Sequence, residues 1–558
     1  MEKRVLLAFA LSIIVFVGWS YLIGPWKKEQ TAPVTPPAGQ EAAAPAERTS
    51  APAAPVRSAL GRGKKSATEI PAANLKDIVI TTDLYTATIT PAGGRLKSLT
   101  LNNYRVGSDP KSPPQELVTT QALQELPVAT YFLDNAVPGL ADAVYAADRP
   151  EIRLDAAKPE DRLTLSWRSS EGFEVVKTFT FRQDTYLIDL AVTLRNLSGQ
   201  GVEDALVLEL TSQPFSQGGR RYSFSGLGLL TDTGLHEVKT KKIAKEMAEI
   251  SSTAKSVTWA AYEDQYFLAG ALPSQPDKTR VKAEALAGDG VRLELLTPPV
   301  LLAPDTEKTY RYALYYGPKD YQRLKALNNG LVRSIYFGWL DLVAKPLLVA
   351  MLWLHGFIKN YGLTIILLTI VVKIAFWPLT AKSYKSMKQM QKLQPQVAKL
   401  REKYKNDREA MNREMMQLYR TFKVNPMGGC LPMVIQIPVF IAFYRLLDYS
   451  LELRHAPFWL WIQDLSAPDR LFHFGFKIPY MQEPAGIPVL TLLMGASMFL
   501  SQKMSPMPGD PAQAKVMTFM PLFFTVIFIN FPSGLVLYWL VNNLLSIGQQ
   551  YFINKRAS

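Results

Sequence analysis

Residues 362–379 read GLTIILLTIVVKIAFWPL, an apolar run with a single charged residue, Lys373. About 20 apolar residues in a helix span the hydrocarbon core of a bilayer, which is about 30 Å thick. The run therefore predicts a transmembrane helix, which we expect Pro378 to end near the cytoplasmic surface. A charge inside a span is costly and marks a candidate functional residue. The simpler alternative is that Lys373 extends along the helix and places its ammonium group at the membrane surface.

Similar apolar runs occur at five other places, so the sequence predicts six spans, of which the last five form an α-helical bundle within residues 360–558. The first run, residues 5–23, is longer than the apolar part of a signal peptide, which has about 7 to 15 residues. We therefore interpret residues 1–28 as an uncleaved membrane anchor, with a cleavable signal peptide as the alternative. The other runs lie at residues 430–447, 488–500, 516–531 and 534–552.

The segment between the second and third spans indicates the orientation of the chain. Residues 382–424 contain twelve Lys and Arg but four Asp and Glu, and basic loops stay in the cytoplasm. Counting spans from this loop places both termini in the cytoplasm and residues 75–319 outside. With Cys430 as its single cysteine the chain cannot form an internal disulfide. These features favour the inner membrane of a Gram-negative bacterium, with a large domain in the periplasm.

The basic segment also has a helical period. Its apolar residues are spaced three or four apart on either side of a break at Asn406-Asp407, which predicts a helical hairpin. Its charge is either a topology signal alone or a surface for ribosomal RNA, anionic lipid or an acidic partner. The methionines of this segment could bind varied apolar partners, because the methionine side chain is flexible. Ordinary packing is the alternative explanation for their presence. The hairpin methionines that we single out are Met387, Met390, Met411 and Met415.

Three other regions precede the bundle. Residues 29–74 are rich in Ala and Pro and contain no aromatic residue, which predicts a disordered linker. Apolar and polar residues alternate at 163–168 and at 188–195, and turn residues punctuate the sequence, so residues 75–319 are expected to form an antiparallel β-sandwich. Residues 320–359 are expected to contain an interfacial amphipathic helix from Val332 to Val343. The apolar piece at 346–358 is expected to lie at the surface or to be re-entrant.

Uncharged polar residues in the predicted spans could line a water-accessible cavity with Lys373. Trp539, Asn542 and Ser546 share one face of the last span. The alternative is that such residues only form hydrogen bonds between neighbouring helices. The candidates beside Lys373 are Thr369, Gln436, Gln502, Trp539 and Asn542.

The chain lacks the sequence signals of the commoner enzymes and of nucleotide-driven transport. It contains no phosphate-binding loop of the Gly-x-x-x-x-Gly-Lys-[Ser/Thr] type, no Gly-x-Ser-x-Gly elbow and no His-Glu-x-x-His motif. Its four histidines are scattered, and no pair has the spacing of a metal motif. We therefore expect no catalytic residue, no metal and no cofactor.

Several motifs in order carry a family resemblance over residues 360–555. They are WPLT at 377–380, NPMGGCLPMVIQIPVF at 425–440, QKMSP at 502–506, MTFMP at 517–521 and FPSGLVLYW at 531–539. In these motifs the chain resembles the YidC/Oxa/Alb membrane protein insertases. The anchor followed by a large outer domain resembles the Gram-negative YidC type.

The resemblance implies a function and a site. Members insert inner-membrane proteins and help them fold, alone or with the Sec translocon, through a hydrophilic groove that opens to the cytoplasm. The groove contains a basic residue, usually Arg, and the matching position here is Lys373, which keeps the charge but lacks the five-donor guanidinium fork. The family's groove-lining residues correspond to Thr369, Gln436, Gln502, Trp539 and Asn542. The implied partners are nascent membrane proteins, the Sec translocon, membrane lipids, and a ribosome or signal recognition machinery at the hairpin.

Two other classes of function are compatible with the residues alone. A secondary transporter would also place a lysine inside the membrane, although the spans show no internal repeat. An envelope-binding protein would have its function in the outer sandwich, and deletion of residues 75–315 would abolish it. An insertase is expected to tolerate the loss of most of that domain.

Overall fold

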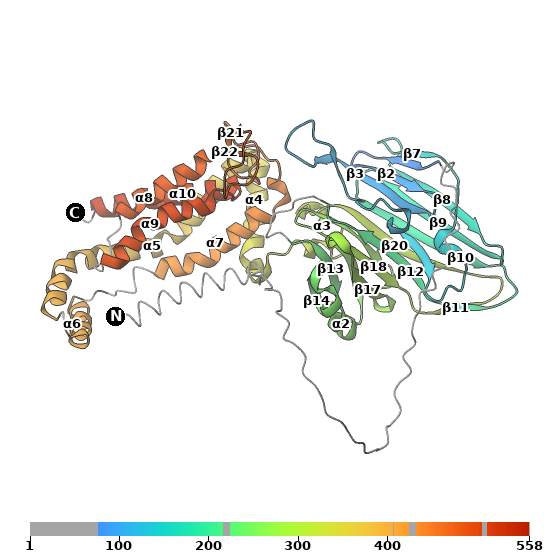
Figure 1. The fold of residues 1–558 in the computed structure, drawn as a ribbon, viewed down its shortest axis with the longest axis horizontal. Coiled ribbons are helices and arrows are strands. Elements are labelled where there is room, and N and C mark those ends of the chain that lie inside the picture. Colours follow the sequence, from blue (N-terminus) through green and yellow to red (C-terminus); the bar gives the residue numbers. More distant parts are fainter. Residues whose placement is uncertain are drawn as a thin grey trace, which may run out of the picture. The chain divides into compact units, whose positions relative to one another are not determined.

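The structure, a computed structural model, describes residues 76–215, 224–404, 407–422, 424, 431–504 and 511–556. These residues form a strand-rich part followed by a helical part (Figure 1). The predicted anchor at 1–28 and linker at 29–74 lie outside the described residues, as do residues 425–430 of the longest motif.

The strand-rich part contains three larger sheets. Strands β8 and β10 occupy the two segments whose alternation was noted in the sequence, and inward and outward side chains alternate along both. The nine-stranded sheet has the order β14 (Gly234–Lys239), β13 (Gly226–Thr231), β15 (Val257–Glu263), β16 (Phe267–Pro273), β20 (Thr306–Pro318), β10 (Leu187–Asn196), β9 (Phe173–Arg182), β8 (Glu160–Arg168) and β6 (Ala146–Ala147).

Two smaller sheets share a hydrophobic core with it. Ile80, Phe179 and Leu208 come from three different sheets and are all buried in this core. The five-stranded sheet has the order β4 (Pro114–Glu116), β3 (Arg95–Arg105), β2 (Tyr85–Thr90), β1 (Ile78–Thr81) and β7 (Glu151–Arg153). The four-stranded sheet has the order β17 (Arg280–Ala285), β18 (Val291–Leu296), β12 (Leu206–Ser212) and β5 (Ala129–Phe132), and β11 (Val202–Asp204) pairs with β19 (Val300–Leu302).

The expectation of a purely antiparallel domain is wrong in two details. Strand β1 pairs with β7 in parallel. Helix α2 (Ile243–Thr253) lies between β14 and β15, and it buries Ile243, Met247 and Ile250 on one side. Three apolar residues at this spacing are too few to distinguish a short helix from a loop in the sequence.

The helical part contains eight helices within the described residues. The five predicted core spans coincide with parts of α5, α7, α8, α9 and α10. The bounds are α3 (Tyr321–Ala326), α4 (Asp341–Ile358), α5 (Tyr361–Lys403), α6 (Arg408–Thr421), α7 (Leu431–Tyr449), α8 (Val489–Met504), α9 (Pro511–Phe528) and α10 (Ser533–Arg556).

Two expectations about the helices are wrong, and proline explains only the second. The chain from Leu331 to Leu340 forms two short 3₁₀ turns, so the amphipathic helix expected over Val332 to Val343 does not exist as one helix. Helix α4 begins at Asp341 and continues through Pro346. Helix α5 likewise continues through Pro378 and ends at Lys403. Neighbouring helices can support a backbone carbonyl that a proline leaves unbonded, so proline is tolerated in such helices.

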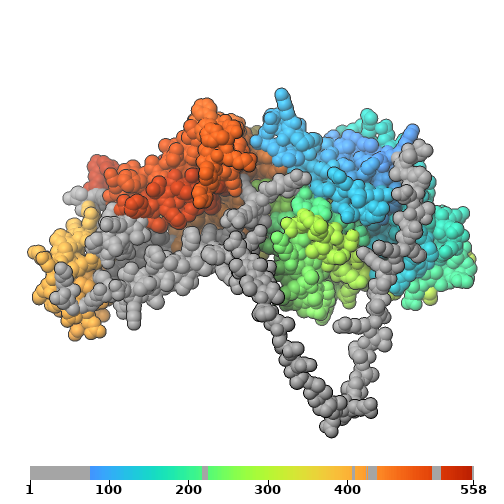
Figure 2. Space-filling model, in the orientation of Figure 1, coloured from blue at the N-terminus to red at the C-terminus, as the bar shows by residue number. Residues whose placement is uncertain are grey.

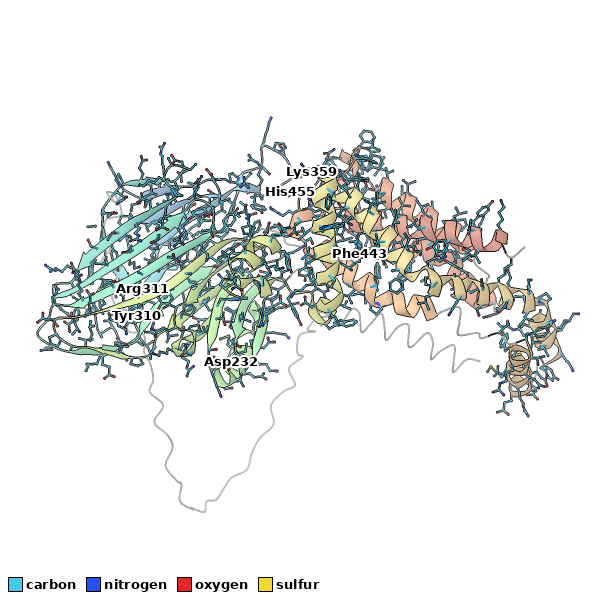
Figure 3. All side chains as sticks on the ribbon, turned by 180° about the vertical axis from the view of Figure 1, so that it is seen from behind. Asp232, Tyr310, Arg311, Lys359, Phe443 and His455 are labelled. Carbon is cyan, nitrogen blue, oxygen red and sulfur yellow. The ribbon has the colours of Figure 1, made fainter. Side chains whose placement is uncertain are left out.

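Helix α10 packs against both α5 and α8, and α8 packs against α9 (Figure 1). Phe443 of α7 lies inside the bundle (Figure 3), where its ring stacks on Tyr538 of α10 with centroids 4.4 Å apart. By length and composition, two described stretches could cross a membrane, Gly338–Ile358 and Tyr361–Lys403, and α8 and part of α9 form shorter apolar helices. The number of spans and the cytoplasmic hairpin therefore stay predictions.

Candidate functional site

Lys373 lies in the first third of α5, with 7% of its surface exposed. Its ammonium nitrogen donates hydrogen bonds to Ser546 Oγ at 2.6 Å and to Asn542 Oδ1 at 3.4 Å, both on α10. Gln436 of α7 donates from Nε2 to the same Asn542 oxygen at 3.3 Å. Three helices that are far apart in the sequence thus bring four polar side chains together.

The charge of Lys373 has no acidic partner within the part of the chain that the structure describes. Both of its hydrogen-bond acceptors are neutral oxygens. An ammonium group has three hydrogens to donate, and these two bonds use two of them. A buried charge is stabilised mainly by hydrogen bonds and by an opposite charge, and only the first is present here. The site is therefore suited to attract a carboxylate.

Two further candidates lie one helical turn from this cluster. Thr369 precedes Lys373 by one turn on α5, is buried, and donates its hydroxyl to Ile365 O at 2.6 Å. Trp539 precedes Asn542 by one turn on α10, and its ring contacts Phe440 and Phe528 at centroid distances of 4.5 and 4.8 Å. Trp539 therefore forms an apolar wall beside the polar cluster.

The other predicted site residues lie elsewhere. Gln502 of α8 donates to the Met517 carbonyl oxygen of α9 and has no hydrogen bond to the Lys373 cluster. Met387 and Met390 are half-buried on α5, at least 14 residues beyond Lys373, which is roughly 20 Å along a helix. On α6, Met411 is buried and Met415 is half-buried.

Three residues continue the polar path and were not among the candidates. In the sequence, Ser546 stands out only as part of a helix face and Thr380 only as part of the WPLT motif, whereas Gln549 belongs to neither. Gln549 donates from Nε2 to Thr380 Oγ1 at 2.8 Å, again between α10 and α5. The spacing of Asn542, Ser546 and Gln549 by four and three residues places them on one face. That spacing is the signal by which the sequence could have revealed them.

The described residues contain no group of three or more His, Cys, Asp or Glu side chains that could hold a metal ion.

Two family models match consecutive parts of the chain: the YidC periplasmic domain over residues 77–350 and the 60Kd inner membrane protein over residues 353–558. The chain is 41% identical to the membrane protein insertase YidC of Syntrophobacter fumaroxidans over 567 aligned residues, covering 100% of both chains. It is 40% identical to the protein of the same name from Syntrophus aciditrophicus, again covering 100% of both. The chain belongs to the YidC membrane protein insertase family.

As a YidC family member, the chain is a membrane protein insertase of the inner membrane with a β-rich periplasmic domain. Among solved structures it is similar to an active YidC insertase with the first transmembrane domain resolved, at 19% identity and a TM-score of 0.36, covering 86% of this chain and 92% of that one. A galactose mutarotase related enzyme from Lactobacillus acidophilus gives 9% identity and a TM-score of 0.30, covering 43% of this chain and 97% of that one.

Proposed function

We propose that the polar cluster around Lys373 is the client-binding part of a hydrophilic groove that opens to the cytoplasm. The observation that supports this most directly is a buried ammonium group whose only described partners are neutral oxygens on α10. An acidic residue in an entering segment would supply the missing opposite charge.

The groove lowers the main barrier to insertion. Moving a short polar segment across a bilayer is opposed by desolvation of its backbone and charges. Polar side chains that reach part-way into the membrane shorten the distance that the segment must cross without water. The apolar part of the client then moves sideways into the lipid along the outer faces of the helices. Lys373, Gln436 and Asn542 would contact the polar tail, and Trp539 with Phe440 would contact its apolar part. This process needs no covalent step and no nucleotide.

We place six spans in the inner membrane, with both termini and the hairpin of α5 and α6 in the cytoplasm. The excess of basic residues in 382–424 supports this orientation. The hairpin would meet a ribosome, signal recognition machinery or anionic lipid, and the bundle would act alone or beside the Sec translocon. Gln502, which joins α8 to α9, would support the groove from outside rather than touch the client.

Lys373→Ala tests the charge directly. Purified wild-type chain in nucleotide-free liposomes should insert two versions of one single-span client, with an acidic or a neutral outer tail. Lys373→Ala should reduce insertion of the acidic version about ten-fold or more, which corresponds to the roughly 1.5 to 3 kcal/mol of a hydrogen bond to a charged group. The neutral version should lose much less.

Two further variants control this experiment. Lys373→Arg keeps the positive charge and should restore most of the insertion of the acidic client. Lys503→Ala removes an exposed positive charge from α8 and should leave both clients unaffected. Equal loss of both clients in Lys373→Ala would contradict attraction by charge and would assign Lys373 a structural role.

A further inference from the structure

The segment that connects α7 to α8 exposes several large apolar side chains. It extends from Ser450 to Pro488 and includes the short hairpin of β21 (Leu471–Phe474) and β22 (Ala485–Ile487). We call residues 471–480 the aromatic loop. The side chains exposed in this segment are Trp459 (58%), Leu460 (80%), Phe472 (70%), Phe476 (65%) and Tyr480 (92%).

Hydrogen bonds to Ile529 and Asn530, which directly follow α9, hold the two ends of the aromatic loop. Arg470 donates from Nη1 to Ile529 O at 2.8 Å and from Nη2 to Asn530 Oδ1 at 3.2 Å. Asn530 donates from Nδ2 to Tyr480 O at 2.5 Å and accepts from Gln482 N at 2.8 Å. These bonds fix the ends of the loop, and the side chains of Phe472, Phe476 and Tyr480 between them are exposed.

The backbone gives a second sign that this outward position is specified. Leu460, Phe472 and Tyr480 have φ values of 58°, 55° and 64°, in the left-handed region that bulky side chains rarely occupy. Strained residues persist where surrounding structure enforces them, and they gather at functional sites. Here three strained residues are also three of the most exposed apolar ones in the segment.

The position of the loop indicates what covers it. It lies at the end of the bundle opposite α6, beside the first turn of α8 (Figure 1), and the segment around it protrudes from the surface (Figure 2). His455 of the same segment is seen at that end too (Figure 3). Leu492 and Leu493, near the beginning of α8, are exposed as well.

The charge of the loop fits a lipid headgroup region. Among residues 471–480, Lys477 is the only Lys, Arg, Asp or Glu. Its ammonium group lies 2.8 Å from Glu483 Oε1. Aromatic residues with a polar tip, such as tyrosine and tryptophan, concentrate at the boundary between headgroups and hydrocarbon. The loop has too few charged side chains for a protein partner to recognise it by charge.

We propose that the aromatic loop inserts into the headgroup region of the outer leaflet and anchors the periplasmic end of α8 and α9 to the lipid. The same lipid would cover the exposed Leu492 and Leu493 of α8. The proposal uses the orientation given under Proposed function, but it does not depend on the groove around Lys373.

Spin labels test the proposal in the full chain. The parent is Cys430→Ser, and single cysteines replace Phe476 or Tyr480, or Leu301 of β19 as the matched control, because Leu301 is an equally exposed apolar residue of the β-rich domain. Each labelled protein is reconstituted into liposomes of phosphatidylethanolamine and phosphatidylglycerol without any other protein. Collisions of the label with oxygen, which prefers lipid, and with a water-soluble nickel complex are then compared.

At 476 and 480 the ratio of oxygen to nickel collisions should be several-fold higher than at 301. Ratios equal to that at 301 would overturn the proposal. Protection from nickel that appears only in native membranes, and not in these liposomes, would also overturn it and would assign the loop to a protein partner. Client insertion by the same liposomes distinguishes the two proposals. If the labels stay in water but insertion persists, the lipid-anchor proposal fails and the groove proposal does not.

Discussion

At the scale of single residues, Lys373 depends on its neighbours on α10 to stay charged at a buried position. Ser546 is the nearer of its two acceptors, at 2.6 Å, and its own hydroxyl hydrogen is donated to Asn542 O at 2.8 Å. Because the serine hydrogen is used in that bond, the serine oxygen is the acceptor in its hydrogen bond with the ammonium group. Ser546 positions Lys373 and would not itself need to touch the client.

Ser546→Ala should weaken the groove more mildly than loss of Lys373. The lost bond involves a charged group, so about 1.5 to 3 kcal/mol of support for the ammonium group is removed. Insertion of the acidic client should fall several-fold, measured in the same liposome assay. Ser546→Thr keeps a hydroxyl and should restore insertion. If both variants match wild type, Ser546 has no positioning role.

Glu237, in the β-rich domain, makes the stability of the protein depend on pH. Burial, and next the negative charge of Glu263, raise its pKa from 4.5 to about 7. The folded protein then binds this proton more tightly than the unfolded chain does. Below about pH 4.5 both states are protonated, and between pH 4.5 and 7 the unfolded chain loses its proton first, so the free energy of unfolding falls as pH rises.

Glu237→Gln should remove this dependence. At pH 8 the variant should unfold at a higher temperature than wild type. The gain in the free energy of unfolding should be at most roughly 3 kcal/mol. At pH 5 the difference should shrink. Thermal unfolding of the full chain in detergent measures both, and Glu203→Gln, at an exposed carboxyl group of β11, is the matched control. A gain that is the same at both pH values would contradict the titration of Glu237.

The site shows where reasoning from sequence succeeds and where it stops. Lys373 and Asn542 could be predicted because a charge or an amide stands out among apolar neighbours. That Gln436 shares an acceptor with Lys373, whereas Gln502 bonds to α9, depends on how the helices are rotated about their axes. Rotation is decided by packing between helices, which no local pattern in one helix contains.

At the scale of elements, the sequence pattern predicts the type of an element better than its ends. The alternation in β8 and β10 arises because one side of each strand packs on the core, so burial itself produces the signal. The sequence predicts that the helix ends at Pro378, because proline removes one backbone hydrogen bond. Helix α5 instead continues to Lys403, so seven of the twelve basic residues of 382–424 lie on the same helix as Lys373.

A buried ion pair joins two elements of the β-rich domain. Lys319, which follows β20, places its ammonium nitrogen 3.0 Å from Glu263 Oε2 of β15, and the side chains are 7% and 0% exposed. Removing one partner of a buried pair leaves the other charge uncompensated, at a cost of about 3 to 5 kcal/mol. Lys319→Met should therefore lower the unfolding temperature of the full chain strongly.

The double variant Lys319→Met with Glu263→Leu distinguishes the effect of an uncompensated charge from the effect of losing the lysine side chain itself. Apolar residues that replace both charges are often neutral for stability. The double variant should thus unfold closer to wild type than Lys319→Met does. If it is as unstable as the single variant, the pair has no special role and packing of the lysine stem explains the loss.

At the scale of the whole molecule, the described residues contain two separate hydrophobic cores. The first comprises the sheets and extends to Leu324 and Leu331, with Leu451 as a contribution from the segment after α7. The second begins at Phe337 and Leu340 and includes buried residues of α4, α5, α7, α8, α9 and α10. The chain passes from one core to the other within a few residues, between Leu331 and Phe337.

This division predicts which deletions the insertase tolerates. Removal of residues 77–315 takes away most of the first core but none of the second, so the bundle should still fold and insert clients at close to the wild-type rate in liposomes. Extending the deletion to residue 351 also removes Phe337, Leu340, Ala344, Leu348 and Met351 from the second core. Each large side chain lost from a core costs about 2 to 5 kcal/mol, so the longer deletion should abolish insertion and folding together. Loss of activity in the shorter deletion, in a protein whose helices still unfold cooperatively, would contradict this division and would give the β-rich domain a direct part in insertion.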